Sequence, residues 1–314
     1  MVIATQTHES ESVARRSTEW ATVALGVAVF AAFLSVTFLG GEWPLWVLLP
    51  LLAITSAWHS SFQHELLHGH PFANQTVNDV IGLLSPQLWI PYREYRRTHL
   101  LHHRNEFLTT PGIDPESYYT TRAIWDARNP FEKALFRANR TLLGRLTIGP
   151  VLVIASSVKS ELPRVINGDD RARRSWAEHI VANGIVLWWV VTMCHMRVWV
   201  YLVGAVYGGL ALVLNRSFVE HRFVGDDHGR TALVQAGPFF SLLYLNNNLH
   251  DTHHERPGAP WHALPALCLE LDSVAKAALG GGAYRGYWDV ARHYGVRSFD
   301  QSVHPSEIGL QSKV

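Results

Sequence analysis

Three histidine clusters are the residues of this chain most able to do chemistry. They supply eight of its 18 histidines: His64-Glu-Leu-Leu-His68, His99-Leu-Leu-His102-His103 and His250-Asp-Thr-His253-His254. Neutral imidazole is a donor that suits iron, copper, zinc and nickel. On a helix, positions i, i+3 and i+4 share one face. Each cluster, or histidine box, can therefore present its imidazoles as one group toward a common point.

The number of imidazoles points to more than one metal ion. A zinc site closes with four ligands, so eight or nine imidazoles suit about two ions of roughly four or five ligands each. Two carboxylates, Glu65 and Asp251, lie between the histidines of their boxes on other helix faces. We interpret them as partners that hold an imidazole tautomer rather than as ligands. The alternative is a set of interfacial histidines bonded to headgroups or backbone. It does not explain why the H-x-x-H-H spacing occurs twice beside H-x-x-x-H.

Long apolar stretches precede the boxes and must position them. The chain is 48% hydrophobic and only 17% charged, below the roughly 25% charge of ordinary soluble chains. Helices of about 20 apolar residues cross the hydrocarbon layer. We predict an all-α integral membrane fold with four transmembrane helices in two hairpins, interfacial helices and a cytoplasmic cap that carries the boxes. The spans are expected near residues 20–39, 43–63, 178–196 and 198–215.

Basic residues set the predicted orientation. Residues 64–179 are rich in arginine, whereas the two turns on the other side hold only Arg197. The positive-inside rule therefore places residues 64–179, both termini and all boxes in the cytoplasm. Two short apolar stretches, 80–91 and 146–158, are expected to be interfacial or re-entrant. An odd number of extra spans would separate the boxes across the membrane.

The predicted organisation has three parts. A cytoplasmic N-terminal tail covers residues 1–19, the membrane domain covers 20–265, and a cytoplasmic C-terminal tail covers 266–314. The net charge of +1 gives no electrostatic reason to expect nucleic acid as a partner.

The three boxes resemble those of the integral-membrane fatty acid desaturase and hydroxylase superfamily, which includes alkane hydroxylases and carotenoid ketolases. The resemblance covers residues 45–265 and implies two non-haem iron ions, molecular oxygen as co-substrate and cytoplasmic boxes. It implies a multi-pass protein of a bacterial plasma membrane. It also implies His221 as a ninth ligand, with Asn215 hydrogen-bonded to a metal-bound water. The alternatives are an interface histidine for His221 and a helix-packing amide for Asn215.

Further polar residues are weaker candidates near the boxes. Asn247, within the run Asn246–Asn248, directly precedes the last box and is a candidate partner of the ligating histidines. His70 precedes Pro71 and is a candidate for a similar role. Around the second box, four arginines are candidates for docking an acidic electron carrier: Arg93, Arg96, Arg97 and Arg104. An ordinary positive-inside anchor explains the same arginines equally well.

The reductant is expected to come from outside the chain. The sequence has no haem signature, no G-x-G-x-x-G fingerprint and no iron–sulfur cysteine cluster. The family relies on ferredoxin, rubredoxin or a b-type cytochrome, each with its reductase. We expect oxygen-dependent desaturation of an apolar, fatty acyl or lipid-like substrate. The alternative is hydroxylation or ketolation of an alkyl, carotenoid or small amino-acid-derived substrate. A membrane metal carrier is a third hypothesis, disfavoured because the predicted spans hold few ionisable residues.

Overall fold

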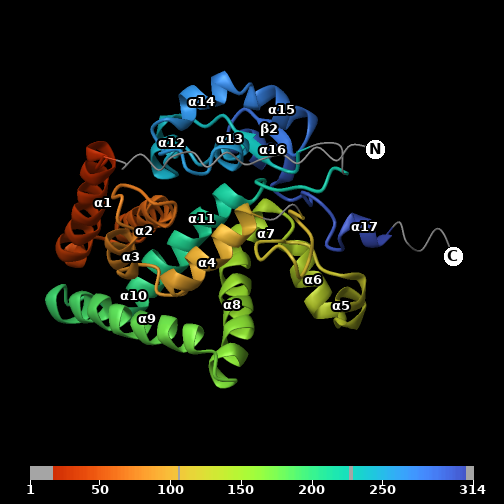
Figure 1. The fold of residues 1–314 in the computed structure, drawn as a ribbon. Helices are drawn as coiled ribbons and strands as arrows, with labels where there is room; N and C mark the ends of the chain where they lie inside the picture. The colour runs from red at the N-terminus through yellow and green to blue at the C-terminus, as the bar shows by residue number, and fades with distance from the viewer. Residues whose placement is uncertain (1–16, 105–106, 226–228, 309–314) are drawn as a thin grey trace.

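Long apolar helices form one side of the molecule (Figure 1). The structure is a computed structural model that describes residues 17–104, 107–225 and 229–308. α1 (Trp20–Leu39) and α2 (Leu45–Leu67) are joined by a 3-10 turn (Gly40–Glu42). α10 (Val198–Tyr201), a π-helical segment (Leu202–Gly208) and α11 (Gly209–Ser217) follow one another without a break. Within the described ranges, three helical stretches are long and apolar enough to cross a membrane: Trp20–Glu42, Leu45–Leu67 and Val198–Ser217. They match three of the four predicted spans.

The fourth predicted span, 178–196, falls on a helix of mixed character. α9 (Asp170–Trp188) begins with charged residues and continues into a π-helical turn, Trp189–Met193. α9 is not among the described stretches that are long and apolar enough to cross a membrane. Its far end nevertheless reaches the α1–α2 turn, because the indole nitrogen of Trp189 donates a hydrogen bond to Thr37 Oγ1 at 3.0 Å. The fourth span stays a prediction.

Glycines let two of the apolar helices pack closely. A Cβ on Gly208 would lie 2.9 Å from Ala53 Cβ, and one on Gly209 would lie 2.6 Å from Ser56 Oγ. Small residues of this kind allow membrane helices to approach backbone to backbone. The contact places α11, which leads into His221, beside α2, which carries the first histidine box at its end.

Shorter helices connect the two apolar parts. They are α3 (Gln75–Leu83), α4 (Tyr92–His103), α5 (Arg122–Ala127), α6 (Pro130–Ala138), α7 (Leu142–Thr147) and α8 (Gly149–Ile166). The apolar stretch 80–91 covers the end of α3 and a following turn, and 146–158 covers the end of α7 and half of α8. α8 exposes a row of apolar side chains, Val151, Val158, Leu162 and Ile166. Whether these stretches touch a membrane surface stays a prediction.

The C-terminal residues form a cap over the ends of α2, α4 and α11 (Figure 1). Its helices are α12 (Pro238–Leu243), α13 (His250–Glu255), α14 (Leu264–Glu270), α15 (Ser273–Leu279) and α16 (Tyr287–Tyr294). The last helix, α17 (Pro305–Ile308), lies apart from the cap on the side of α5 and α6 (Figure 1). Tyr287 and Phe299 pack in the same core cluster as Phe218. The packing therefore continues across the predicted boundary at 265/266.

A small sheet corrects the expectation of an all-helical fold. β1 (Ala232–Val234) and β2 (Gly282–Tyr284) form a two-stranded parallel sheet, with Ala232 opposite Gly282. The glycines before β2 make this approach possible, because a Cβ on Gly281 would lie 2.4 Å from the Thr231 carbonyl oxygen.

Candidate metal centre

The first histidine box lies at the end of α2. This helix runs for 23 residues, and its last turns are buried against α1 and the start of α4 through Phe62, Leu66 and Tyr92. His64 lies in the last turn, and His68 is the residue that caps it. Their ring centroids are 4.7 Å apart. The i, i+4 spacing therefore gives a pair of imidazoles on one face, as predicted.

The second box ends α4 and sends its imidazoles in two directions. His99 and His103, four residues apart, point to the same side, with ring centroids at 4.6 Å. His102 contacts a different partner, His221, with the two Nε2 atoms at 3.0 Å. Neighbouring positions on an α-helix differ by about 100°, and His102 and His103 point to different groups of imidazoles. This corrects the expectation that each box faces one common point.

The third box forms the short helix α13. In the segment that precedes this helix, Leu245 and Asn246 have positive φ angles of 49° and 59° and turn the chain sharply. The turn is held by Asn246 Nδ2, which donates to the Trp261 carbonyl at 3.0 Å, and by Asn248 Nδ2, which donates to the Val234 carbonyl at 2.7 Å. These two asparagines thus fix the backbone that presents the box.

His221 joins this centre from outside any helix. It follows α11 by four residues and pairs with Thr231 in an isolated antiparallel bridge. Its Nε2 lies 3.0 Å from the Nε2 atoms of both His102 and His250.

The nine predicted histidines come together in two adjoining groups that could hold metal ions. The five-histidine group consists of His64, His68, His99, His103 and His253, and the four-histidine group of His102, His221, His250 and His254. Within each group the candidate ligand atoms lie within 4.8 Å of one another. The groups touch where the rings of His103 and His254 stack, with centroids 4.2 Å apart.

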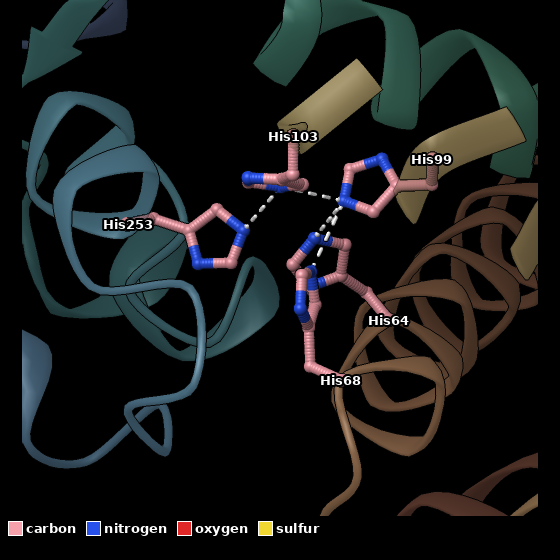
Figure 2. Close-up of side chains that lie close together, drawn as sticks. All are labelled: His64, His68, His99, His103 and His253. Carbon is pink, nitrogen blue, oxygen red and sulfur yellow. Dashed lines mark hydrogen bonds between the residues drawn. The ribbon is translucent and has the colours of Figure 1, made fainter. Parts of the chain in front are cut away.

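Figure 2 shows the five imidazoles turned toward one another. The Nε2 atom of His99 lies 2.9 Å from that of His64, 3.2 Å from that of His68 and 3.0 Å from that of His103. The Nε2 atoms of His253 and His103 are 3.1 Å apart. Nitrogens bound at about 2.1 Å to a shared ion lie roughly 3 Å apart, so these spacings fit a shared cation.

Two carboxylates lie within hydrogen-bond distance of the Nδ1 atoms of two imidazoles. His99 Nδ1 lies 2.8 Å from Glu116 Oε1, and His102 Nδ1 lies 2.8 Å from Asp114 Oδ1. If Nδ1 carries the proton that each carboxylate accepts, the Nε2 of the neutral ring is a bare lone pair. Lone pairs 3 Å apart repel, and a cation between them removes that repulsion. The donor set therefore fits metal ions.

The electrostatics of the same residues favours neutral imidazoles. Burial lowers the pKa of His221 to about 3, and burial also lowers the pKa values of His99, His103, His253 and His254. Burial opposes ionisation of Glu116, but its contacts with the His99 and His102 imidazoles outweigh burial and hold the pKa of Glu116 well below its usual range. His102 is the exception, since Glu116 and Asp114 outweigh its burial and raise its pKa. Neutral imidazole is the form that binds metals.

Three carboxylates near the histidines escaped the sequence analysis. Asp114 and Glu116 follow the second box in an irregular loop, where no periodic pattern marks them. Asp114 also accepts hydrogen bonds from the backbone N–H groups of Thr109 and Glu116, at 2.8 and 2.9 Å. Glu220 directly precedes His221, and its Oε1 lies 3.5 Å from His250 Nδ1 and 3.2 Å from Arg216 Nε. Adjacency to His221 was the one signal available for Glu220.

The carboxylates inside the boxes have other partners, which corrects their interpretation as holders of imidazole tautomers. Asp251 accepts a hydrogen bond from Thr231 Oγ1 at 2.5 Å. Glu65 accepts one from the backbone N–H of Trp261 at 2.9 Å, and it lies 4.0 Å from His64 Nδ1. Both follow a histidine by one position, so the helix turns them about 100° from the ligand face.

The remaining polar candidates divide between two roles. Asn247 contacts both groups, with Nδ2 3.3 Å from His64 Nε2 and Oδ1 3.2 Å from His250 Nδ1. Asn215 Nδ2 donates to the Tyr244 hydroxyl at 3.1 Å, which is a contact between helices. His70 Nδ1 lies 2.7 Å from Glu19 Oε1 and ties the start of α1 to the end of the first box.

The arginines proposed for docking are largely engaged within the chain. Arg93 pairs with Glu178, Arg96 lies 3.6 Å from Asp79, and Arg97 Nε donates to Glu94 Oε2 at 2.7 Å. Arg104 is exposed at the end of α4. Docking at these arginines stays a prediction.

Comparison with known proteins bears on the identity of this centre. The sequence model of the family described as Fatty acid desaturase matches residues 41–288, which include all nine histidines. No curated protein matches the chain. The matched region covers most of the 314 residues, and the chain therefore belongs to the fatty acid desaturase family.

Proposed function

We propose that this protein is an oxygen-dependent desaturase of an aliphatic, fatty acyl or lipid-like substrate. The observation that carries the proposal is the pair of adjoining histidine groups inside the region matched by the family. The balanced reaction takes an R–CH2–CH2–R′ segment, O2, two electrons and two protons to R–CH=CH–R′ and two waters. The hydrogens that leave the substrate end in water.

The ligand sets follow from the geometry. The five-histidine group would hold one iron and the four-histidine group the other. Iron bound there would supply the activation of oxygen that removal of an unactivated hydrogen requires. The chain's own carboxylates, Asp114 and Glu116, hold the imidazoles of His102 and His99 in the orientation that presents Nε2 to the centre.

Four membrane passages with a cytoplasmic centre are part of the proposal. α2 and α11 both end at the histidine centre, so the start of α10 must lie at the opposite ends of these helices. The chain leaves α2 at the centre, and one further crossing before Val198 would bring it to that opposite side. α9 supports this crossing, since Trp189 contacts Thr37 at the far end of α1. Ile180, Ile185 and Trp188 of α9 are exposed apolar side chains suited to lipid.

The electrons are proposed to come from a separate carrier with its reductase, because the sequence holds no redox motif besides the histidines. Ferredoxin, rubredoxin and b-type cytochromes are the candidate classes. A bacterial plasma membrane with the centre facing the cytoplasm would give such a soluble carrier access.

The test is product analysis in a host that expresses the full chain with each carrier and its reductase. Mass spectrometry should show a lipid or small metabolite that has lost two hydrogens, only with oxygen present and not with His99→Ala. A product that has instead gained oxygen would make the protein a hydroxylase or ketolase. Hydrogen removal under strict anaerobiosis would refute the oxygen-dependent reaction. About two bound irons without any product would favour a metal carrier.

A further inference from the structure

A basic hollow lies on the side of the molecule away from the apolar spans. It has a volume of about 480 Å³ and is lined by α5, α6 and residues 298–303. Three arginines, Arg122, Arg137 and Arg140, contribute to its wall, against one carboxylate, Asp300. The aromatic ring in the wall belongs to Trp125, and the Arg137 guanidinium lies over it at 5.4 Å from the ring centroid. The hollow is named the α5–α6 pocket below.

The arginines of this pocket are not neutralised in the way that those of α4 are. Among the described residues, neither Arg137 nor Arg140 has a carboxylate oxygen within ion-pair distance. Arg140 is only 5% exposed, and its Nη2 has no hydrogen-bond partner in the described part of the chain. Arg122 pairs with Asp126 at 2.8 Å, but both are exposed, and such pairs stabilise little. A buried guanidinium with an unmet donor favours an anionic partner.

The two helices that line the pocket also carry exposed apolar side chains. Phe131 of α6 is 71% exposed and Ile124 of α5 is 53% exposed. Aromatic and arginine side chains are enriched at protein interfaces, and charged pockets beside apolar anchors give specificity. In Figure 1, α5 and α6 lie at the edge of the molecule opposite α1, beyond α8. This position favours a soluble partner over a lipid surface.

Hydrogen bonds connect the pocket wall to the histidine centre. The backbone of Thr120 exchanges hydrogen bonds with the backbones of Ser302 and His304. The Nε2 atom of His304 lies 3.3 Å from Thr109 Oγ1. The backbone N–H of Thr109 donates to Asp114 Oδ2 at 2.8 Å, and Asp114 Oδ1 holds His102 Nδ1 at 2.8 Å. Three hydrogen bonds, through Thr109 and Asp114, thus connect His304, the residue after the wall residue Val303, to the candidate metal ligand His102.

We propose that the α5–α6 pocket is where a small acidic electron carrier docks, which replaces the arginines of α4 as the docking face. This rests on the proposed function, since an oxygen-dependent desaturase needs external electrons. Two reduced carriers dock in turn and each is oxidised by one electron per turnover, and those two electrons, with two substrate hydrogens and two protons, reduce O2 to two waters. Opposite charges on the two surfaces would speed their encounter and fix their orientation.

The experiment measures binding of oxidised carriers to the full chain in nanodiscs, without substrate or oxygen. The probes are a [2Fe–2S] ferredoxin, a rubredoxin and the soluble haem domain of a b-type cytochrome. At low salt, R122E/R137E should lower the affinity for the tightest-binding of the three carriers by about tenfold or more. This loss of affinity should be smaller at high salt. The matched control, R96E/R97E, makes the same change in net charge on α4 and should alter that affinity by less than about twofold.

The outcomes separate this proposal from the proposed function. Binding does not depend on desaturation, so a chain that binds a carrier at these arginines but makes no product leaves the docking face standing. Equal binding by wild type and R122E/R137E for all three carriers would overturn the proposal, as would a larger loss with R96E/R97E. Pyrophosphate or anionic-lipid binding that is lost in R122E/R137E, with carrier binding unchanged, would overturn it too. Thermal unfolding shows whether the charge reversal disturbs folding. If it does, R122Q/R137Q, which removes the two positive charges and adds no negative ones, should still weaken carrier binding.

Discussion

The two histidine groups are built from the same helices but in opposite proportions. α4 gives His99 and His103 to the five-histidine group and His102 to the four-histidine group. α13 does the reverse, with His253 in the five-histidine group and His250 and His254 in the other. In each H-x-x-H-H box, the i and i+4 imidazoles stay together and the i+3 imidazole crosses over. The boxes thus couple the two groups, so that neither can form without both helices in register.

The groups differ in their remaining supports. α2 adds a pair, His64 and His68, to the five-histidine group, on a long buried helix. Besides its ligands from α4 and α13, the four-histidine group contains His221, which lies beyond the end of α11 on irregular backbone. Carboxylates support the imidazoles of this group in place of a long helix, since Asp114 holds His102 and Glu220 lies near His250. The comparison suggests that one group is positioned mainly by helix packing and the other by hydrogen bonds.

The largest effect is expected from removing ligands of one group at a time. H64A/H68A should leave about one iron per chain, held by the four-histidine group, while H221A should lower the occupancy of that second group. Turnover should fall by at least about 10³-fold in both, because metal-supplied stabilisation is worth several kcal/mol. Elemental analysis and product formation measure the two results. His293→Ala is the control, since His293 is 63% exposed and outside both groups.

Loss of both irons from either variant would contradict the view that the two histidine groups bind iron separately. It would mean that the two groups form one cooperative unit rather than two separable sites.

Sequence analysis could predict the convergence of the nine histidines but not their division. The helical spacing of each box gives the shared face, and His221 follows from the family resemblance. The division depends on the relative orientation of α4 and α13, which long-range packing sets. Asp114 and Glu116 could not be predicted from periodicity, because they lie in a loop without a repeating pattern. Three of the four predicted spans fall on long apolar helices, whereas α9 begins with charged residues, so the fourth span stays a prediction.

The next largest loss of turnover is expected from replacing Asp114 or Glu116, the carboxylates that hold His102 and His99. D114N should reduce turnover by about 10- to 100-fold, and E116Q by less within the same range, as is usual for residues that orient ligands. The Asp114 side chain is 1% exposed and bonds to two backbone N–H groups as well, whereas the Glu116 side chain is 34% exposed. Turnover, with iron content measured in parallel, tests the order. A larger loss in E116Q would show that the five-histidine group depends on hydrogen bonds more than its helices suggest.

Asn247 tests whether the groups share a support. It contacts His64 in one group and His250 in the other. N247A should lower turnover by about tenfold, the low end for a residue that orients ligands. Asn248→Ala is the matched control, because Asn248 bonds to the Val234 backbone instead and its loss should cost about 1 kcal/mol of unfolding free energy. Equal activity losses in the two variants would mean that Asn247 acts only by holding the loop.

The smallest effect is expected at Asp251, a carboxylate inside a box that touches no metal candidate. Its neighbours His250 and His253 serve different groups, yet its own carboxylate bonds to Thr231 at the edge of β1. D251N keeps an oxygen that can accept this bond, so iron content should stay at the wild-type level and turnover within about twofold. D251A removes the acceptor from a largely buried hydroxyl and should lower the unfolding free energy by about 1 kcal/mol, measured by chemical denaturation. Loss of iron from D251N at constant stability would place a carboxylate in the metal centre after all, and the division into helix-held and carboxylate-held groups would no longer describe the third box.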